Sequence, residues 1–358
     1  MTIAPPRPTE DQPTASRKPL PRPRPSQFVM VVGILAALGT LASGVAPEIT
    51  GWHPSIALPV TRSNVTREVF GNIPSAVVVM FYCVVAAMLV VTASLIANRV
   101  RNYERGRPDN RRTTRKNVAR RMRDFRRGVW MQTLLRDPAA GAMHSMLYFG
   151  FIGLLIATIV LEIDHQMPPQ LQFLHGSVYQ GYSFVADAAG LIFMVGIVWA
   201  FLRRYVQRPY RIRIKTKPEH LVILITFFVI AKTGFAVEAA RIALAGRPAA
   251  EKWSFIGYPS SWFFEGMNPS TLSTVHRWLW VAHFAAFVVF LVILPTTMLR
   301  HMVTSPMNMW WRDRARPKGA MKPMPNLIET ELDTFGAVRI EDFTWKQLFD
   351  TDACTVCG

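Results

Sequence analysis

Long uninterrupted apolar stretches dominate the pattern of hydrophobic and polar positions along the chain. A membrane core about 30 Å thick needs a helix of about 20 residues to cross it. Stretches of that length occur at roughly 28–46, 74–98, 141–163, 181–202, 220–244 and 276–299. The pattern predicts an all-α polytopic membrane protein whose six spanning helices form a bundle.

The segment before the first apolar stretch has a different composition. Residues 1–27 are polar and rich in proline, and they lack the short apolar core and small-residue cleavage site of a signal peptide. We expect a disordered cytoplasmic tail at 1–27, a membrane domain at 28–302 and a cytoplasmic linker over 303–358.

The basic residues are unevenly distributed. Of 358 residues, 50% are apolar and only 18% are charged, yet 41 Lys and Arg against 23 Asp and Glu give a net charge of +18. Counted along the sequence, 34 of the 41 lie in 1–27, 99–138, 203–219 and from 300 onward, whereas the alternate loops hold 4. Basic loops stay in the cytoplasm, which predicts that both termini are cytoplasmic and that the protein lies in a bacterial cytoplasmic (inner) membrane. Topology and anionic lipid headgroups account for the charge without a nucleic-acid partner.

Five of the eight histidines fall in or at the ends of these stretches, where an ionisable side chain is a candidate functional group. His283 and His301 are 18 residues apart, which on one continuous helix places them on one face about 27 Å apart. His144 and His165, on the third stretch, are about 31 Å apart. His144 then comes level with His301, and His165 with His283. Facing pairs at two depths predict two haem b groups, each with two axial histidines.

The sixth stretch carries a more specific pattern. His283 is followed by 11 residues, then Pro295, then L-R-H-x-x-x-x-P, in which the histidine is His301. This pattern resembles the gamma subunit of respiratory nitrate reductase and related membrane subunits of heterodisulfide-reductase-like complexes. The resemblance implies that His283 and His301 bind one haem b each and that His144 is the partner of His301.

The second ligand of the haem at His283, which we call the outer haem, departs from that family's pattern. The family has it ten residues after the first ligand on the partner helix, and Leu154 stands there in this chain. By depth, His165 is the first choice for this ligand. His175 in the following loop is the second choice, and His276, which shares the face of His283, is a third.

The chain ends on a cysteine motif. Three cysteines are too few for a disulfide framework, and Cys354-x-x-Cys357 suits a zinc half-site, a redox dithiol, a c-type haem attachment or the start of an iron–sulfur motif. Gly358 stands where haem attachment needs a histidine, and the segment lacks the βαβ context of a redox dithiol. Acidic residues before CxxCG favour the opening of a four-cysteine 4Fe-4S motif.

The whole length, notably YSFVADAAGLIFMVGIVWAFLRRY, TGFAVEAARIAL and DACTVCG, resembles the N-terminal membrane half of bacterial fused iron–sulfur oxidoreductases. Some of these heterodisulfide-reductase-like proteins are electron-transfer flavoprotein:menaquinone oxidoreductases. The resemblance implies electron-transfer flavoprotein as donor and menaquinone as acceptor, with Cys354 and Cys357 as the first ligands of a 4Fe-4S cluster. On this basis, 303–358 leads into a ferredoxin-like domain that is truncated in this chain.

Several charged residues lie within the apolar stretches. Asp187, Lys232 and Glu238 are candidates for quinone or proton chemistry, because ionisable groups at such depth are costly unless paired or functional. The alternative is that the carboxylates neutralise Lys232 or Arg241. Haem propionates need cationic partners, and the further candidates are Arg241, Arg277 and Arg300.

These features predict a quinone-linked oxidoreductase, in which a membrane cytochrome b passes electrons between a cytoplasmic iron–sulfur domain and menaquinone. Two alternatives stay open. One is a heterodisulfide-reductase-like or quinol-oxidising subunit with another donor, and the other is a transporter with structural histidines. The internal repeat that would favour a transporter is not evident in the sequence.

Overall fold

The computed structural model describes residues 24–51, 55–56, 63–109, 115–132, 134–312, 326, 328–329, 331 and 337–354. Within these ranges the regular secondary structure is helical, apart from two isolated bridges, Thr66 with His175 and Arg107 with Thr344. Six helices are long and apolar enough to cross a membrane. The all-α fold with six spans is therefore confirmed.

Each predicted stretch forms one span, and each span is longer than the stretch predicted for it. The first span consists of α1 (Pro25–Thr40), a π-helical segment (Leu41–Val45) and α2 (Ala46–Thr50). The others are α3 (Ser75–Glu104), α5 (Pro138–Gln166), α6 (Gly176–Phe201, with a π-helical extension to Gln207), α8 (Pro218–Leu244) and α10 (Pro269–Thr296).

Prolines and capping side chains set where several of these helices begin. Proline stands in the first turn of α1, α5, α8 and α10, where its missing N–H costs no helical hydrogen bond. Asp137 accepts the Ala140 amide at the start of α5 (3.1 Å), and Asn268 accepts the Ser270 amide at the start of α10 (3.0 Å).

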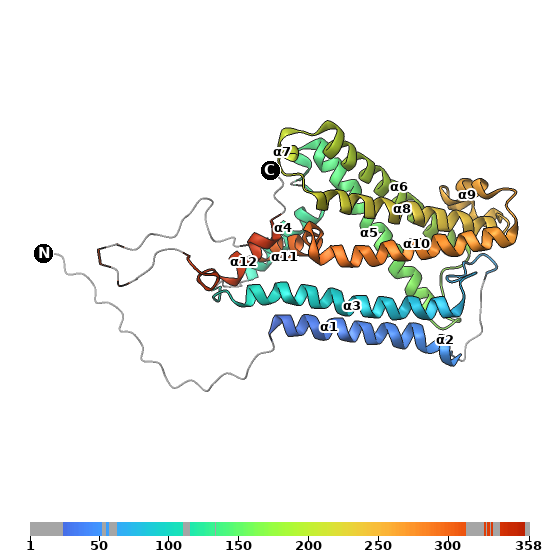
Figure 1. The fold of residues 1–358 in the computed structure, drawn as a ribbon, viewed down its shortest axis with the longest axis horizontal. Helices are drawn as coiled ribbons and strands as arrows, with labels where there is room; N and C mark the ends of the chain where they lie inside the picture. Colours follow the sequence, from blue (N-terminus) through green and yellow to red (C-terminus); the bar gives the residue numbers. More distant parts are fainter. Residues whose placement is uncertain are drawn as a thin grey trace.

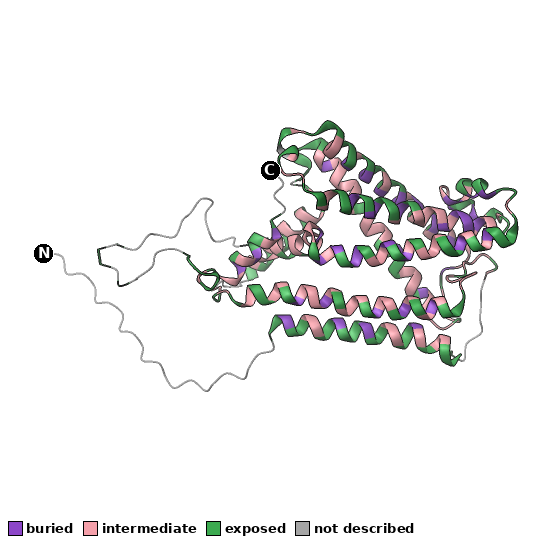
Figure 2. Ribbon diagram, viewed as in Figure 1, coloured by how far each residue is buried: buried purple, intermediate pink, exposed green. Residues whose placement is uncertain are grey.

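The spans pack in the order α1, α3, α10, α8, α6, α5 (Figure 1). Four phenylalanines from four of these helices meet in the core: Phe151, Phe193, Phe227 and Phe290, with ring centres 5.3 to 6.1 Å apart. Large apolar side chains remain exposed along the outward faces of the helices, as expected of surfaces that face lipid (Figure 2).

The two ends of the bundle differ in charge. The basic end, as we call it, carries α4 (Arg115–Val129), α7 (Tyr210–Arg213), α11 (His301–Trp311) and α12 (Trp345–Ala353). The opposite end carries the short helix α9 (Gly257–Ser260) and the loops before α3 and α6. The positive-inside rule predicts that the basic end faces the cytoplasm.

The last span is broken just before His301. Helix α10 ends at Thr296, Thr297 is extended (φ −110°, ψ −174°), and one 3-10 turn (Met298–Arg300) leads into α11, which starts at His301. The predicted placement of His283 and His301 on one face of a continuous helix is therefore wrong. Helix α11 runs from His301 to Trp311 and so spans the predicted domain boundary at 302, which stays a prediction.

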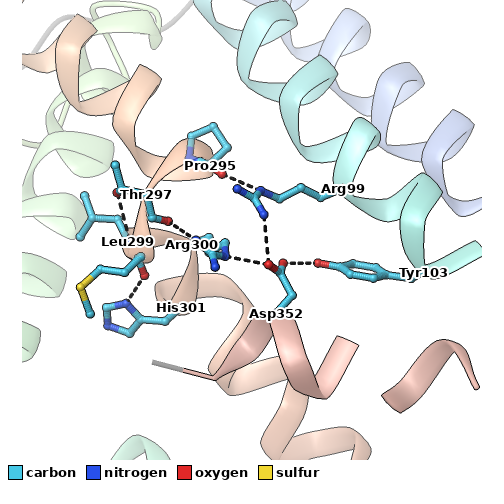
Figure 3. Close-up of polar contacts among 9 residues, drawn as sticks. Arg99, Tyr103, Pro295, Thr297, Leu299, Arg300, His301 and Asp352 are labelled. Carbon is cyan, nitrogen blue, oxygen red and sulfur yellow. Dashed lines mark hydrogen bonds and ion pairs between the residues drawn. The ribbon is translucent and has the colours of Figure 1, made fainter. Parts of the chain in front are cut away.

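Neighbouring side chains satisfy the carbonyls that the break releases. Pro295 has no N–H for the Leu291 carbonyl, and the Thr92 hydroxyl donates to that carbonyl instead (3.3 Å). The Pro295 carbonyl accepts from Arg99 Nε at 2.8 Å (Figure 3). Two side chains of α3 thus stabilise the interruption in α10.

We predict that Gly150→Ala destabilises the bundle. An added Cβ would lie 2.7 Å from the backbone nitrogen of Phe193, so α5 and α6 must separate, at a cost of about 1–3 kcal/mol in the free energy of unfolding. Reversible unfolding in mixed detergent micelles, followed by circular dichroism, measures this change.

The matched control is Gly181→Ala on α6, where an added Cβ meets no atom within 4 Å. This variant should keep its stability or gain up to about 1 kcal/mol from alanine's higher helix propensity. An equal loss of unfolding free energy in Gly150→Ala and Gly181→Ala would contradict the close contact at Gly150.

Candidate functional site

The predicted pair of histidines at the basic end meets in the structure. His144 on α5 and His301 at the start of α11 have ring centres 6.3 Å apart, with the ring planes tilted by 54°. The two residues are 157 positions apart in the chain. The break before α11 sets the direction in which His301 leaves the backbone.

The hydrogen bonds of these rings leave nitrogens free to bind a metal. His301 Nδ1 contacts the Met298 carbonyl at 2.6 Å (Figure 3). A carbonyl can only accept, so Nδ1 carries the proton and Nε2 has a free lone pair. Burial lowers the pKa of His301, which favours this neutral form. His144 Nδ1 is buried without a hydrogen-bond partner.

The spacing of the pair fits one iron between the two rings. A metal that takes one nitrogen from each imidazole at about 2 Å requires ring centres about 6 Å apart, which agrees with the observed 6.3 Å. The described residues include no group of three or more His, Cys, Asp and Glu side chains suited to a metal ion. Haem iron needs only two axial protein ligands, so the pair suffices.

His283, in the middle of α10, is the corresponding histidine toward the opposite end. Its Nδ1 lies 3.0 Å from the Thr233 hydroxyl on α8, and that hydroxyl donates to the Val229 carbonyl at 2.6 Å. The single hydroxyl proton is thus used, so Nδ1 of His283 is the donor and Nε2 is free. A Cβ on Gly234 would lie 3.4 Å from the His283 ring, so a glycine gives the ring room.

His276 is oriented in the opposite way. Its Nδ1 lies 3.3 Å from the amide nitrogen of Asn72, which also donates to the Ser273 carbonyl. The Asn72 amide oxygen accepts from Ser273 and Arg277, which fixes the orientation of the amide. Nδ1 of His276 is therefore an acceptor, and the proton lies on Nε2. This tautomer suits a structural role better than an iron ligand.

The other two ligand candidates lie near the opposite end. The His165 ring packs edge-on against Phe70, with ring centres 5.1 Å apart. His175 is the residue before α6, and its backbone pairs with Thr66. Among the described residues, no contact between either ring and His283 is found. The second ligand at His283 therefore stays a prediction.

Asp187 and Glu238 form a buried pair of carboxyl groups. Asp187, on α6, is 2% exposed, and its Oδ2 accepts the amides of Ile256 (2.6 Å) and Gly257 (3.2 Å). Glu238, on α8, lies beside Asp187 and packs directly on Gly257. Two adjacent buried carboxyl groups are an arrangement in which one proton can be held between them.

Arg241 is paired with a different carboxylate. Its guanidinium makes two bonds to Glu251, at 2.7 and 3.0 Å, and the Tyr179 hydroxyl donates to Glu251 at 3.0 Å. Burial alone would raise the pKa of Glu251, but the Arg241 hydrogen bonds and charge outweigh it, and this pKa lies below its ordinary value. Arg241 thus ties α8 to the loop that contains Glu251.

The remaining charged candidates have varied surroundings. Arg277 donates to the backbone and side-chain oxygens of Asn72, at 2.9 and 3.2 Å. Arg300 is paired with Asp352 at 2.9 Å. Lys232 is exposed on the face of α8 that also exposes Phe228 and Val229.

Arg67 is a residue that sequence reasoning missed. It lies before α3 at the opposite end, and its Nε is buried without a hydrogen-bond partner. The ionisable groups near it are Tyr179, Tyr182, Glu238, Glu251, His276 and His283. The sequence does distinguish Arg67, because it is a basic residue in a loop on the side where basic residues are few.

The cysteine motif lies partly in the described chain. Cys354 is exposed just after α12. Cys357 lies outside the described residues.

The chain is similar to two oxidoreductases. It is 34% identical over 234 residues to the EtfAB:quinone oxidoreductase of Syntrophomonas wolfei, covering 63% of this chain and 32% of that protein. It is 25% identical over 244 residues to the probable iron-sulfur-binding oxidoreductase FadF of Bacillus subtilis, covering 66% of this chain and 34% of that protein. The chain thus spans about a third of the length of these curated relatives.

No protein-family model matches the chain, and no solved structure matches it. The names of the two relatives support the oxidoreductase predicted from the sequence, together with links to iron–sulfur binding, EtfAB and a quinone.

We predict that Glu251→Gln lowers the free energy of unfolding by about 3 kcal/mol at neutral pH, because it leaves the Arg241 charge buried and unpaired. Because the pKa of Glu251 is lowered in the folded protein, the ionised side chain stabilises the fold fully at pH values above its ordinary pKa of 4.5. This stabilisation is lost as the pH falls through the lower pKa of the folded state. The difference between wild type and variant should therefore shrink in acid.

Unfolding in micelles at pH 7 and pH 4 measures both effects. Tyr179→Phe, which removes one hydroxyl and keeps the ion pair, should cost only about 1 kcal/mol. If the stability difference between Glu251→Gln and wild type is the same at pH 4 as at pH 7, the ion pair between Glu251 and Arg241 does not account for it.

Proposed function

We propose that this chain is a membrane electron-transfer module of a quinone-linked oxidoreductase in a bacterial cytoplasmic membrane. It holds a haem b between His144 and His301, takes electrons from a cytoplasmic iron–sulfur domain and delivers them to menaquinone. The observation that carries the proposal is the pair of imidazoles 6.3 Å apart, one of them fixed in the tautomer that an iron ligand needs.

Haem b at this pair would supply one-electron chemistry, and the residues around it set its position. The Met298 carbonyl orients the His301 ring. Met143, Leu147 and Met302, neighbours of the two histidines in sequence, pack against the hydrophobic core of the bundle. His283, held by Thr233, is the ligand that supports a second haem b toward the opposite end, with His165 first among the partners proposed for it.

The groups at the opposite end support quinone chemistry. Reduction of a quinone consumes protons, and the Asp187–Glu238 pair holds a proton in a buried position near Arg67. Arg67 offers a guanidinium that can bind a quinone oxygen or a haem propionate. Arg241, Arg277 and Arg300 all have protein partners, so Arg67 is the stronger candidate for this role.

The donor is proposed from the relatives. The name of the Syntrophomonas protein joins EtfAB to a quinone, and the name of the Bacillus protein states iron–sulfur binding. By analogy we infer that electron-transfer flavoprotein is the donor and that Cys354 and Cys357 are ligands of a 4Fe-4S cluster.

We predict that His144→Ala and His301→Ala each remove the same b-type haem, a loss of about one haem per chain, because each takes away one of two axial ligands. The reduced-minus-oxidised visible spectrum of the purified protein measures the loss. His283→Ala should remove a different haem.

The control is His220→Ala on α8, whose Nδ1 contacts the Lys217 backbone at 3.0 Å; it should leave the spectrum unchanged. Wild-type protein supplied with haem that shows no b-type spectrum would refute the proposed function. Variants of His144 and His301 that lose different haems would refute the pairing.

We predict that Asp187→Asn and Glu238→Gln retain haem but lower menaquinone-linked turnover at least about tenfold, because each interrupts a positioned proton donor. Glu265→Gln, an exposed carboxyl at the same end, serves as control. Wild-type rates in both variants would remove the pair from proton transfer.

A further inference from the structure

Asp352 collects hydrogen bonds from three side chains at the basic end (Figure 3). Its Oδ1 accepts from Arg99 at 3.0 Å and from Arg300 at 2.9 Å, and its Oδ2 accepts from the Tyr103 hydroxyl. The Asp352 side chain is only 17% exposed. Charge-assisted bonds to a carboxylate at such a half-buried position are stronger than ion pairs in water.

This contact joins three parts of the fold that are distant in sequence. Arg99 and Tyr103 lie on α3, Arg300 lies in the turn between α10 and α11, and Asp352 lies on α12. Both arginines are also fixed on the helix break: Arg99 donates to the Pro295 carbonyl, and Arg300 donates to the Thr297 carbonyl, both at 2.8 Å. The carboxylate therefore binds guanidinium groups that already have a fixed direction.

Apolar packing holds the rest of α12 in the same place. Phe349 packs edge-on against Tyr103 (ring centres 5.4 Å apart) and against Trp311 (5.3 Å), and Trp345 also packs against Trp311 (5.4 Å). Backbone bonds between Arg107 and the residues on either side of Thr344 tie the segment before α12 to the end of α3.

The position of Asp352 in the chain gives this contact its significance. Arg300, which binds Asp352, immediately precedes His301, and Asp352 is two residues before Cys354. One carboxylate thus connects the exposed cysteine to the backbone that carries an iron ligand.

We propose that Asp352 is a positioning residue that docks the cysteine-bearing end of the chain onto the His144–His301 site, so that electrons reach the haem from this segment. The docking itself stands on the contacts of α12, and its use in electron transfer rests on the proposed function. Asp352 touches neither iron nor substrate; it acts through Arg300 and α12.

The docking is tested by hydrogen exchange on the full chain in detergent, comparing wild type with Asp352→Asn. The amides of Trp345–Ala353 should exchange at least about tenfold faster in the variant, while those of α10 keep their rates. Tyr103→Phe, which removes one hydroxyl only, should give a smaller increase and serves if Asp352→Asn fails to fold.

The matched control is Glu341→Gln, which removes a carboxylate from the same segment. The partner of Glu341 is Arg105, and both side chains are about half exposed, so their ion pair contributes little. Exchange in α12 should stay at the wild-type rate. Equal exchange in wild type and Asp352→Asn would overturn the docking role.

The electron route is tested with a ruthenium bipyridine label on Cys354, in a chain with Cys83→Ser and Cys357→Ser. After a light flash the excited label gives one electron to ferric haem, which becomes ferrous, and added ascorbate reduces the oxidised label. Haem reduction should slow at least about tenfold in Asp352→Asn, in line with the lost docking, and Asp352→Glu should restore part of the rate.

The proposed function and the docking role of Asp352 can be refuted independently. A chain without haem refutes the proposed function, and hydrogen exchange still decides the docking. Haem reduction at the wild-type rate in Asp352→Asn, together with faster exchange of α12, would overturn the role of the docking in electron transfer.

Discussion

The break in the last span is the constraint on which the rest of the site depends. A proline in the final turn of a membrane helix releases carbonyls that no lipid can satisfy, so the protein must supply donors for them. Thr92 takes the carbonyl of Leu291, and Arg99 takes that of Pro295. The turn that follows exposes two further carbonyls, and these orient Arg300 and His301. In an unbroken helix these carbonyls would accept hydrogen bonds from backbone N–H groups. Here they accept hydrogen bonds from side chains instead, and these bonds fix the side chains of the site.

One interruption therefore has two consequences at the same place. It turns His301 toward His144 on α5, and it sets two guanidinium groups toward α12. A continuous helix would place His301 elsewhere and leave Asp352 without Arg300. The spacing of the two imidazoles and the contacts of α12 thus both depend on residues 295–301.

The parts predictable from sequence were those that depend on local pattern. Six spans follow from the length of the apolar stretches, and the pairing of His144 with His301 follows from depth and resemblance. The break at Thr297 was not predicted, because Pro295 alone does not say whether a helix kinks or ends. The contacts of Arg241, Asp352 and Arg67 were not predicted either. They depend on packing between segments that are distant in the chain, and no sequence motif marks such contacts.

The two ends of the bundle carry different sets of side chains. At the basic end two imidazoles face one another, and Asp352, two residues before Cys354, is paired with Arg300 beside His301. At the opposite end His283 is accompanied by the buried Asp187, by Glu238 and by Arg67. Between them lie Phe151, Phe193, Phe227 and Phe290. A layer of aromatic side chains carries no protons, so the proposed function requires that the protons for menaquinone enter on the side of Asp187 and Glu238.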